Sequence, residues 1–457
     1  MADDLMQKIT SLAKRRGFVF PGSEIYGGFA NTWDYGPLGA ELKNVVKKLW
    51  WKKFVQDRAD MYGLDASILM NPKVWEASGH VQGFNDALVD CKNCKQRIRA
   101  DHLIEDKLDI KVEGKTMAEL DTIIKDNELV CSNCGGKDLT EPRKFNLLFK
   151  TMVGTLEDEK SAVFLRGETA QAMFVNFRNI VDTMRPKLPF GMAQSGKAFR
   201  NEITPGNFIF RTLEFEQMEI EYFIKEAEWK KWFEYWQNEM ESWLDEIGIN
   251  RDNIRWREHT KDELSHYSRK TADIEYKYPF GFKEMYGLAY RTDYDLKQHA
   301  KFSKKDLEYF DPQTNKKFIP HVIEPTFGAD RTMLTLLVDA YTEEEVKGEK
   351  RVVLKFDKKV APIKVAVFPL ARNKKELVDL AHKVFDGLKD SYPAMYDASG
   401  SIGKLYRRQD EIGTPFCITV DFDSLTDQAV TVRDRDTMEQ ERVKIDKLLE
   451  YFGSRFK

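Results

Sequence analysis

The chain has 457 residues, of which 42% are hydrophobic and 32% are charged. This length allows two or three domains, and the composition is that of a globular protein. No apolar run approaches the roughly 20 residues that a membrane helix needs, and the charged N-terminus lacks a secretory signal. The sequence therefore predicts a cytoplasmic protein with no membrane contact. With a net charge of −3, a nucleic-acid partner would have to be held by local basic patches.

The first clear element along the chain is a helix over residues 38–54. Apolar residues from Leu42 to Leu49 recur at the spacing i, i+3, i+4 and i+7, while lysines take the other faces. Pro37 stands just before this pattern, where proline suits the first helical turn. The pattern therefore predicts an amphipathic helix that begins near Pro37.

Residues 86–160 are polar, and we interpret them as an insertion that carries four of the five cysteines. These four form two C-x₂-C pairs: Cys91, Cys94, Cys131 and Cys134. The spacing is typical of a tetrahedral zinc site, although the gap between the pairs is long. In a reducing cytoplasm a metal is favoured over disulfides, so we predict structural Zn²⁺, with four ordinary reduced thiols as the alternative. The fifth cysteine, Cys417, lies in an apolar run and is interpreted as a buried thiol.

Residues 187–224 predict two long strands around a turn at 203–207. Residues 191–197 have the glycine and lysine spacing of a phosphate loop. However, Ala198 stands where the magnesium-binding Ser or Thr belongs, and the segment continues as a strand instead of opening a helix. We therefore reject the phosphate loop.

The two strands carry side chains that suit a nucleotide. Because strand side chains alternate between faces, one face of the second strand gathers an arginine, an aromatic ring, an amide and a carboxylate. These residues are Arg211, Phe215, Gln217 and Glu219. On the first strand, Arg200 shares a face with Glu202. Guanidinium groups clamp phosphates and aromatic rings stack on bases, so the strands predict an ATP site, with a salt-bridged surface hairpin as the alternative.

The chain beyond these strands is less regular. Residues 226–247 predict two Trp-rich helices, within a mixed segment over about 225–320 that we interpret as a further insertion. Residues 319–337 are apolar and turn near Gly328 into a predicted helix.

A domain boundary is predicted near residue 360, where the charged run 355–359 gives way to an alternating apolar strand. Residues 361–457 are expected to form a compact α/β domain. Its strands are predicted at 363–370, 416–420 and 429–432, and its helices at 374–389 and 438–452.

Three segments resemble, in order, the sequence motifs of class II aminoacyl-tRNA synthetases. Residues 35–39 with the following helix resemble motif 1, which forms dimers. Residues 199–202 with the returning strand resemble motif 2, and residues 324–331 resemble motif 3. Three shorter strings narrow the resemblance to glycyl-tRNA synthetases. They lie at residues 75–80, 99–102 and 166–171.

The resemblance covers nearly the whole chain and implies its fold, reaction and partners. The expected fold is a catalytic domain over residues 1–360, with a mainly antiparallel sheet flanked by helices, and an α/β anticodon-binding domain over residues 361–457. A homodimer is implied. The implied reaction joins glycine to ATP, with Mg²⁺, as a glycyl-adenylate, and then transfers glycine to its tRNA.

The resemblance also implies individual residue roles. The residues implied in catalysis are Arg200, Glu284 and Arg331. The implied ATP-binding set adds Asn201, Glu202, Phe210, Arg211, Phe215, Met285 and Gly328. A pocket for glycine needs acceptors for an ammonium group and a wall against any β-carbon, and the implied set is Arg99, Glu168, Glu219, Glu324 and Thr326. Thr326 stands where many relatives have serine.

The C-terminal domain is expected to read tRNA through clustered arginines. These are Arg407, Arg408, Arg433 and Arg435. Guanidinium groups can meet phosphates or unpaired bases, although a solvated charged face is the alternative. Two rival functions remain: a class II synthetase for threonine, serine or proline, and an inactive relative that only binds nucleic acid. An inactive relative would be expected to lose the ATP arginines, yet Arg200, Arg211 and Arg331 are all present.

Overall fold

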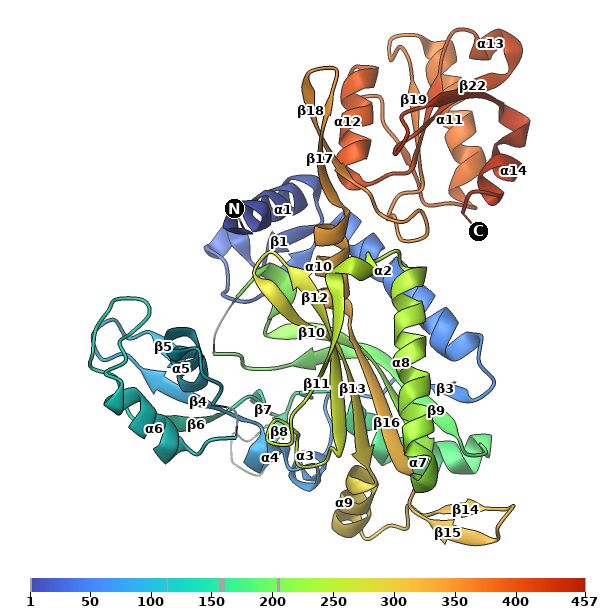
Figure 1. Cartoon of the computed structure of the whole chain (residues 1–457). Helices are drawn as coiled ribbons and strands as arrows, with labels where there is room; N and C mark the ends of the chain where they lie inside the picture. The colour runs from blue at the N-terminus through green and yellow to red at the C-terminus, as the bar shows by residue number, and fades with distance from the viewer. Residues whose placement is uncertain (1, 113, 156–160, 204–205, 457) are drawn as a thin grey trace.

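A computed structural model describes residues 2–112, 114–155, 161–203 and 206–456 (Figure 1). Its centre is a seven-stranded sheet in the order β11-β12-β13-β16-β10-β9-β3. All neighbouring strands run antiparallel except β3 and β9, which are parallel. The strands are β3 (Met61–Gly63), β9 (Phe190–Phe199), β10 (Glu214–Ile224), β11 (Ile254–Glu258), β12 (Lys270–Tyr278), β13 (Gly281–Thr292) and β16 (His321–Gly328).

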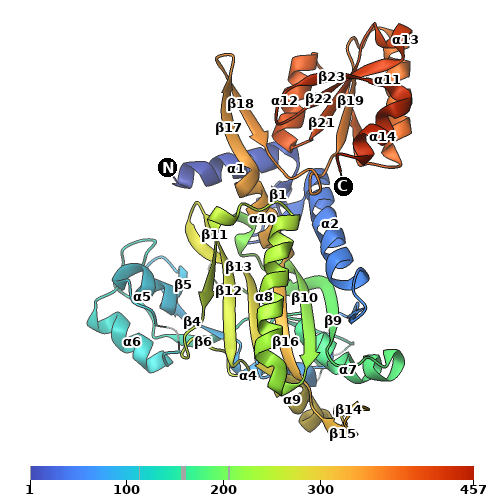
Figure 2. The same cartoon turned by 45° about the vertical axis from the view of Figure 1, so that its right-hand side comes forward.

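Helices pack on both faces of this sheet. The main core contains residues of α2 (Pro37–Trp51), α8 (Trp229–Glu246) and α10 (Ala329–Ala340) together with the sheet. A smaller core lies under α7 (Ala170–Met184) and α9 (Tyr294–Ser303). Figure 2 shows α8 lying along the length of the sheet. Within the described residues, no helix combines the length and the apolar character needed to cross a bilayer.

The predicted helix over residues 38–54 is confirmed as α2, which begins at Pro37 after Gly36 and continues through a π-helical turn, Lys52–Gln56. The two Trp-rich helices predicted over 226–247 are wrong. One short 3-10 turn leads into the single helix α8, because Phe233, Trp236, Met240 and Trp243 recur on one buried face.

The two strands predicted over residues 187–224 are confirmed as β9 and β10, paired from Phe199 with Glu214 to Phe190 with Phe223. Residues 191–197 lie within β9, so they open no helix and cradle no phosphate. Of the predicted turn at 203–207, Thr204 and Pro205 lie outside the described residues. The segment over about 225–320, predicted as an insertion, instead supplies α8 and the strands β11, β12 and β13 of the central sheet.

The described part of residues 86–160 forms a separate module beside the sheet (Figure 1). It holds a three-stranded sheet in the order β5-β4-β6 and a core of its own. Its elements are β4 (Asn85–Asp90), β5 (Arg97–Arg99), α5 (Ala100–Leu108), α6 (Met117–Asp126) and β6 (Arg143–Asn146). Helix α6 begins with a capping box, in which the Thr116 and Glu119 side chains satisfy each other's backbone N–H groups.

The C-terminal part of the chain contains a five-stranded sheet in the order β20-β19-β21-β22-β23. Helices α11 and α14 pack on one face and α12 on the other. The elements are β19 (Val365–Pro369), α11 (Lys375–Lys389), β20 (Ala394–Tyr396), α12 (Ile402–Ile412), β21 (Phe416–Val420), α13 (Ser424–Asp427), β22 (Ala429–Asp434), β23 (Gln440–Lys444) and α14 (Leu448–Gly453).

The helix predicted over residues 438–452 is wrong over most of its length. Residues 440–444 form β23, which pairs antiparallel with β22, and only the short helix α14 follows. Pairing with β22 and burial of Val443 override the local helical pattern.

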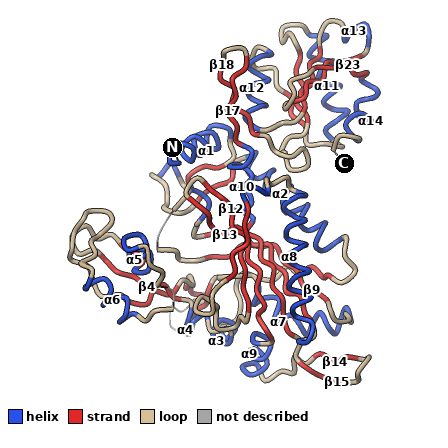
Figure 3. Tube along the Cα trace, in the orientation of Figure 1, coloured by secondary structure: helices blue, strands red, loops and turns tan. Residues whose placement is uncertain are grey.

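A hairpin of β17 (Tyr341–Val346) and β18 (Glu349–Leu354) connects the part of the chain with the central sheet to the C-terminal part and packs against α12 (Figure 3). The remaining elements are α1 (Ala2–Arg16), β1 (Val19–Pro21), β2 (Trp33–Tyr35), α3 (Lys73–Ala77), α4 (His80–Gly83), β7 (Lys150–Met152), β8 (Ala162–Phe164), β14 (Tyr309–Asp311) and β15 (Lys316–Phe318).

Candidate active site

A cavity of about 360 Å³ opens on the central sheet, within the size range of small-molecule sites. It is lined from β10, β13, β16 and the first turn of α10. Most of the residues proposed from the sequence line this one cavity: Glu168, Arg200, Glu202, Phe210, Arg211, Phe215, Glu219, Glu284, Met285, Glu324, Thr326, Gly328 and Arg331. The three arginines thus share a single hollow.

Arg200 follows directly after β9, where it faces two aromatic rings. Its guanidinium carbon lies 5.2 Å from the ring centres of both Phe84 and Phe215. Its Nε donates a 3.0 Å hydrogen bond to the carbonyl of Gly167. These contacts fix the plane of the guanidinium group, which is the geometry needed for a bidentate phosphate contact.

Arg331 and Glu284 form an ion pair at the same end of the cavity. Nη1 of Arg331 lies 3.0 Å from Oε1 of Glu284 and also donates to the Glu284 carbonyl oxygen. The guanidinium carbon lies 4.6 Å over the ring of Phe210. The charge of Arg331 lowers the pKa of Glu284, so this carboxylate is ionised at neutral pH.

Arg211 and Glu202 complete the cationic end. Their closest charged atoms, Nε and Oε2, are 4.0 Å apart. Burial lowers the pKa of Arg211, and the guanidinium groups of Arg99 and Arg331 lower it further. Three cations and two carboxylates in one hollow can hold a polyphosphate with its counterion.

The other end of the cavity is acidic and is built on β10 and β16. Glu219 accepts hydrogen bonds from the hydroxyls of Thr169, at 2.5 Å, and Thr326, at 3.0 Å. Burial and the neighbouring carboxylate of Glu168 raise the pKa of Glu219. A positively charged ligand would offset this cost, so the geometry suits an ammonium group.

Glu168 and Glu324 are held by a buried arginine that the sequence reasoning missed. Arg291 is 1% exposed and donates to Oε1 of Glu324 at 2.6 Å and to Asp295 at 2.9 Å. Its Nη2 lies 3.7 Å from Glu168. Burial raises the pKa of Glu324 to about 8. The available signal was the spacing of Arg291 and Asp295, which are four residues apart after an apolar strand.

Two proposed residues do not line this cavity. Arg99 lies in a second hollow within the insertion, 3.1 Å from Asp86 and paired also with Asp101. Asn201 follows Arg200 but is not part of the lining, and its backbone N–H donates to Leu147.

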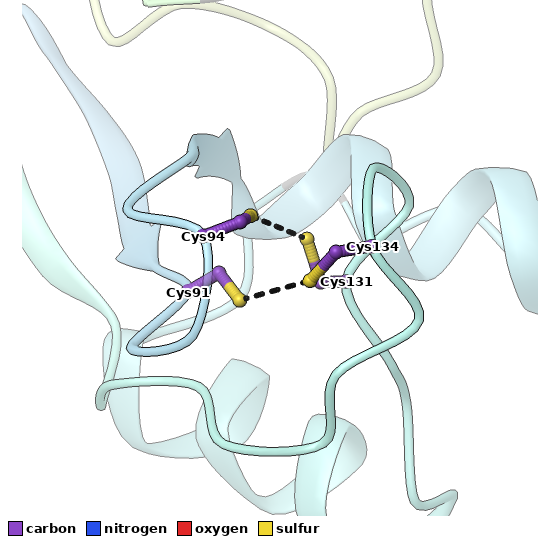
Figure 4. Close-up of side chains that lie close together, drawn as sticks. All are labelled: Cys91, Cys94, Cys131 and Cys134. Carbon is purple, nitrogen blue, oxygen red and sulfur yellow. Dashed lines mark hydrogen bonds between the residues drawn. The ribbon is translucent and has the colours of Figure 1, made fainter.

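The four cysteines of the insertion converge on one point (Figure 4). The Sγ atoms of Cys91 and Cys134 lie 3.6 Å apart and those of Cys94 and Cys131 lie 3.7 Å apart. A tetrahedron with Zn–S bonds of about 2.3 Å has edges of roughly 3.8 Å, so the four sulfurs fit zinc. Each pair sits on a tight turn, in which the N–H of Lys95 or Gly135 donates to the first cysteine's carbonyl.

The arginines of the C-terminal part fall into two groups. Arg433 and Arg435 are 6% and 3% exposed. Arg433 pairs with Asp410 at 3.0 Å, and Arg435 donates to the carbonyls of Gly413 and Phe356. The guanidinium groups of Arg433 and Arg435 are therefore both engaged in contacts inside the protein. Arg407 and Arg408 on α12 remain partly exposed.

Two protein-family models match the chain. Residues 103–344, more than half of its 457 residues, match the tRNA synthetase class II core domain (G, H, P, S and T). Residues 364–455 match the anticodon binding domain. The fold and the site thus define a class II aminoacyl-tRNA synthetase.

Curated relatives narrow the class further. The chain is 59% identical to the glycine–tRNA ligase of Caldanaerobacter subterraneus subsp. tengcongensis, over 99% of this chain and 98% of that protein. It is 58% identical to the glycine–tRNA ligase of Acetivibrio thermocellus, over the same shares. The identity to the glycine–tRNA ligase of Bacillus anthracis is 56%, over 97% of both chains. The chain belongs to the glycine–tRNA ligase family, which confirms the resemblance and the expected fold class.

Proposed function

We propose that the cavity on β10, β13 and β16 joins glycine to ATP and then to the 3′ end of the glycine-accepting tRNA. Residues 1–360 act as the catalytic domain and residues 361–457 bind the anticodon. The observation that carries this proposal is one hollow with guanidinium groups at one end and buried carboxylates at the other. The first end suits a triphosphate and the second suits the ammonium group of an amino acid.

In the first step, an oxygen of the glycine carboxylate attacks the α-phosphorus of ATP and pyrophosphate leaves. Arg200 donates hydrogen bonds to the α-phosphate, where negative charge builds up. Arg211 and Arg331 hold the γ-phosphate. Mg²⁺, when bound, neutralises phosphate charge, and Glu284 is the carboxylate that would hold it. This chemistry requires alignment and charge stabilisation, and no side-chain nucleophile.

The remaining residues of the ATP end bind the nucleoside. Phe215, whose ring also contacts Arg200, stacks on the adenine ring. Glu202 lies near the adenine edge, where a carboxylate can accept from an amino group. Phe210, Met285 and Gly328 support this side from the cavity lining, and Asn201 supports it from beside Arg200, outside the lining.

Glycine is selected by charge and by space. The carboxylates of Glu168, Glu219 and Glu324 accept hydrogen bonds from its ammonium group, and Thr326 stands as the wall against a β-carbon. Larger amino acids are excluded by overlap, so a glycine enzyme needs no editing step. We assign no glycine contact to Arg99, because it lies in the second hollow.

In the second step, the 3′-terminal hydroxyl of tRNA attacks the glycyl carbonyl and AMP leaves. We propose Arg407 and Arg408 as tRNA contacts, since they are the partly exposed arginines of α12. Because tRNA, ATP and glycine meet in the cytoplasm, we place the enzyme there.

Glu219→Gln tests the glycine pocket. We expect the KM for glycine in ATP–pyrophosphate exchange to rise about 30-fold or more. The glycine ammonium loses its hydrogen bond to the charged Glu219 carboxylate, and such a bond is worth roughly 1.5–3 kcal/mol. The KM for ATP should stay within about twofold. Glu214→Gln, on the same strand but exposed and paired with Lys197, is the control. An unchanged glycine KM would remove Glu219 from the pocket.

We propose that the cysteine cluster holds structural zinc. Changing Cys91 and Cys131 together to serine is expected to abolish zinc binding and unfold the insertion, because structural zinc contributes roughly 10–16 kcal/mol of binding free energy to folding. Metal analysis should give about one zinc per wild-type chain. Limited proteolysis should then cut the variant within residues 86–160 first.

Cys417→Ala is the matched control for the zinc experiment, because this buried cysteine lies in β21, away from the cluster. Its zinc content should equal that of the wild type. A wild-type chain purified without zinc that keeps its insertion protease-resistant would contradict the proposal.

We propose a homodimer formed around β1, β2 and α2. Ile25 and Tyr26, which lie between the two strands, are 88% and 87% exposed, and Phe29 beside them is 64% exposed. Such an apolar patch marks a protein contact in a stable globular chain. Sedimentation should give twice the mass of the 53.3 kDa chain, whereas a monomer at micromolar concentration would refute the assignment.

A further inference from the structure

Glu221 is a buried carboxylate directly behind the proposed glycine pocket. It lies on β10, two residues after Glu219, so the two side chains share a face of the sheet. It is 0% exposed and does not line the cavity. Among the described residues, neither of its oxygens has a hydrogen-bond donor. A buried ionised carboxylate with no donor is strongly disfavoured, so this side chain requires an explanation.

The surroundings of Glu221 are mostly acidic. Glu219, Glu221 and Glu324 each place an oxygen within 4.8 Å of the oxygens of the other two. The nearby charged groups on other elements are Arg291 of β13 and Asp295 of α9. Arg291 already donates to Asp295 and to Oε1 of Glu324, and it makes no hydrogen bond to Glu221. The cluster therefore holds more negative charge than its one arginine neutralises.

We propose that Glu221 is a positioning residue that remains protonated and donates its hydrogen to the carboxylate of Glu324. The hydrogen stays on Glu221, and no bond is broken. The carboxylate of Glu324 then accepts one hydrogen bond from Arg291, at Oε1, and a second from the neutral carboxyl group of Glu221. Both donors favour the ionised form of Glu324 against the protonated form that burial favours, and they hold it as an acceptor for the glycine ammonium. This inference rests on the proposed glycine pocket and extends it by one residue.

Electrostatics and strand geometry agree with this assignment. Burial raises the pKa of Glu221 well above its ordinary value, and the charge of Glu324 is the largest neighbouring cause. Glu324 lies on β16, which pairs with β10 on either side of Glu221, from Glu219 with Thr326 to Tyr222 with Ile323. Facing side chains on paired strands lie within reach of one another, and oxygens of Glu221 and Glu324 lie within 4.8 Å.

Two substitutions separate a donated hydrogen from other roles. Glu221→Gln keeps a neutral donor of similar shape, and Glu221→Met fills a similar volume without any donor. In ATP–pyrophosphate exchange by the full-length chain, we expect Gln to keep the glycine KM within about threefold of the wild type. Met should raise the glycine KM at least about tenfold, with the KM for ATP unchanged in both because the ATP end is untouched.

Infrared difference spectroscopy provides a readout that a purely structural role would not change. The wild type should show the carbonyl stretch of a protonated carboxylic acid, perturbed when glycine is added. With glycine bound, when its ammonium group keeps Glu219 and Glu324 ionised, Glu221→Gln should lose this band, and Glu214→Gln, the exposed control on the same strand, should keep it. Circular dichroism establishes that each variant is folded.

The outcomes distinguish a failure of the role proposed for Glu221 from a failure of the proposed glycine pocket. If Glu221→Gln raises the glycine KM as much as Glu221→Met, or if the acid band survives in Glu221→Gln, Glu221 does not act as a neutral donor. A wild-type glycine KM in folded Glu221→Met overturns the positioning role. If Glu219→Gln also leaves the glycine KM unchanged, the glycine pocket itself fails.

Discussion

We expect Arg200→Ala to abolish glycyl-adenylate formation while leaving the protein folded. The guanidinium group is fixed by Phe84, Phe215 and the carbonyl of Gly167, so its loss removes an oriented positive charge from the α-phosphate. Losing one oriented donor to developing charge costs about 10²–10³ in rate, and Arg200 supplies two donors and a full charge. We therefore expect ATP–pyrophosphate exchange with glycine to fall by about 10³-fold or more.

Arg200→Lys and Arg178→Ala are the comparisons for this experiment. Lysine keeps the charge but lacks the planar fork, so it should recover only part of the rate. Arg178 lies exposed on α7, paired with Asp182, and its alanine variant should exchange at the wild-type rate. Exchange by Arg200→Ala within tenfold of the wild type would remove Arg200 from the reaction.

Asp410→Ala should uncouple the C-terminal part from the catalytic domain. Asp410 is buried on α12 and pairs with Arg351 of β18 at 2.8 Å and with Arg433 of β22 at 3.0 Å. Its removal leaves the buried Arg433 without a carboxylate and Arg351 with only Glu344, and breaking a buried pair in this way costs about 3–5 kcal/mol. We expect denaturant unfolding to split into two transitions. Charging of tRNA should fall strongly, while glycine-dependent pyrophosphate exchange should persist.

Asp421→Ala is the matched control in the same domain. Asp421 pairs with the more exposed Arg442 and accepts hydrogen bonds from Ser424 and Thr431, so its contacts stay within the C-terminal part and do not reach the hairpin. This variant should unfold in the same transition as the wild type and charge tRNA normally. A single unchanged transition in Asp410→Ala would mean that the hairpin β17–β18 and the C-terminal sheet do not depend on this carboxylate.

The active-site strands could be predicted because strand side chains alternate between faces, so residues two apart in the sequence identify one functional face. Phe215 and Glu219 recur on one face of β10, and both line the cavity. Arg291 and Glu221 could not be predicted in this way. Their roles arise from contacts between β10, β13, β16 and α9, which are brought together only by the order of strands in the sheet. Their local signals are a charged residue within an otherwise apolar strand and, for Arg291, the acidic Asp295 four residues later.

In the C-terminal part, local sequence patterns led to wrong predictions. Arginine clusters predict a nucleic-acid surface, yet Arg433 and Arg435 are buried in contacts with Asp410, Gly413 and Phe356. Composition counts charge but does not report which charges are already neutralised inside the fold. The strand β23 was missed for a related reason, because an edge strand depends on its partner and not on its own sequence.

The chain enters and leaves the insertion along one pair of antiparallel strands, β4 and β6. Asn85 at the start of β4 lies directly opposite Asn146 at the end of β6. Opposed residues of an antiparallel pair have Cα atoms about 5 Å apart, a gap that a short turn can close. The chain therefore leaves and re-enters the synthetase core at nearly the same point. The cysteine module could be exchanged for a tight turn, or for another small domain, without changing the length of any strand in the core.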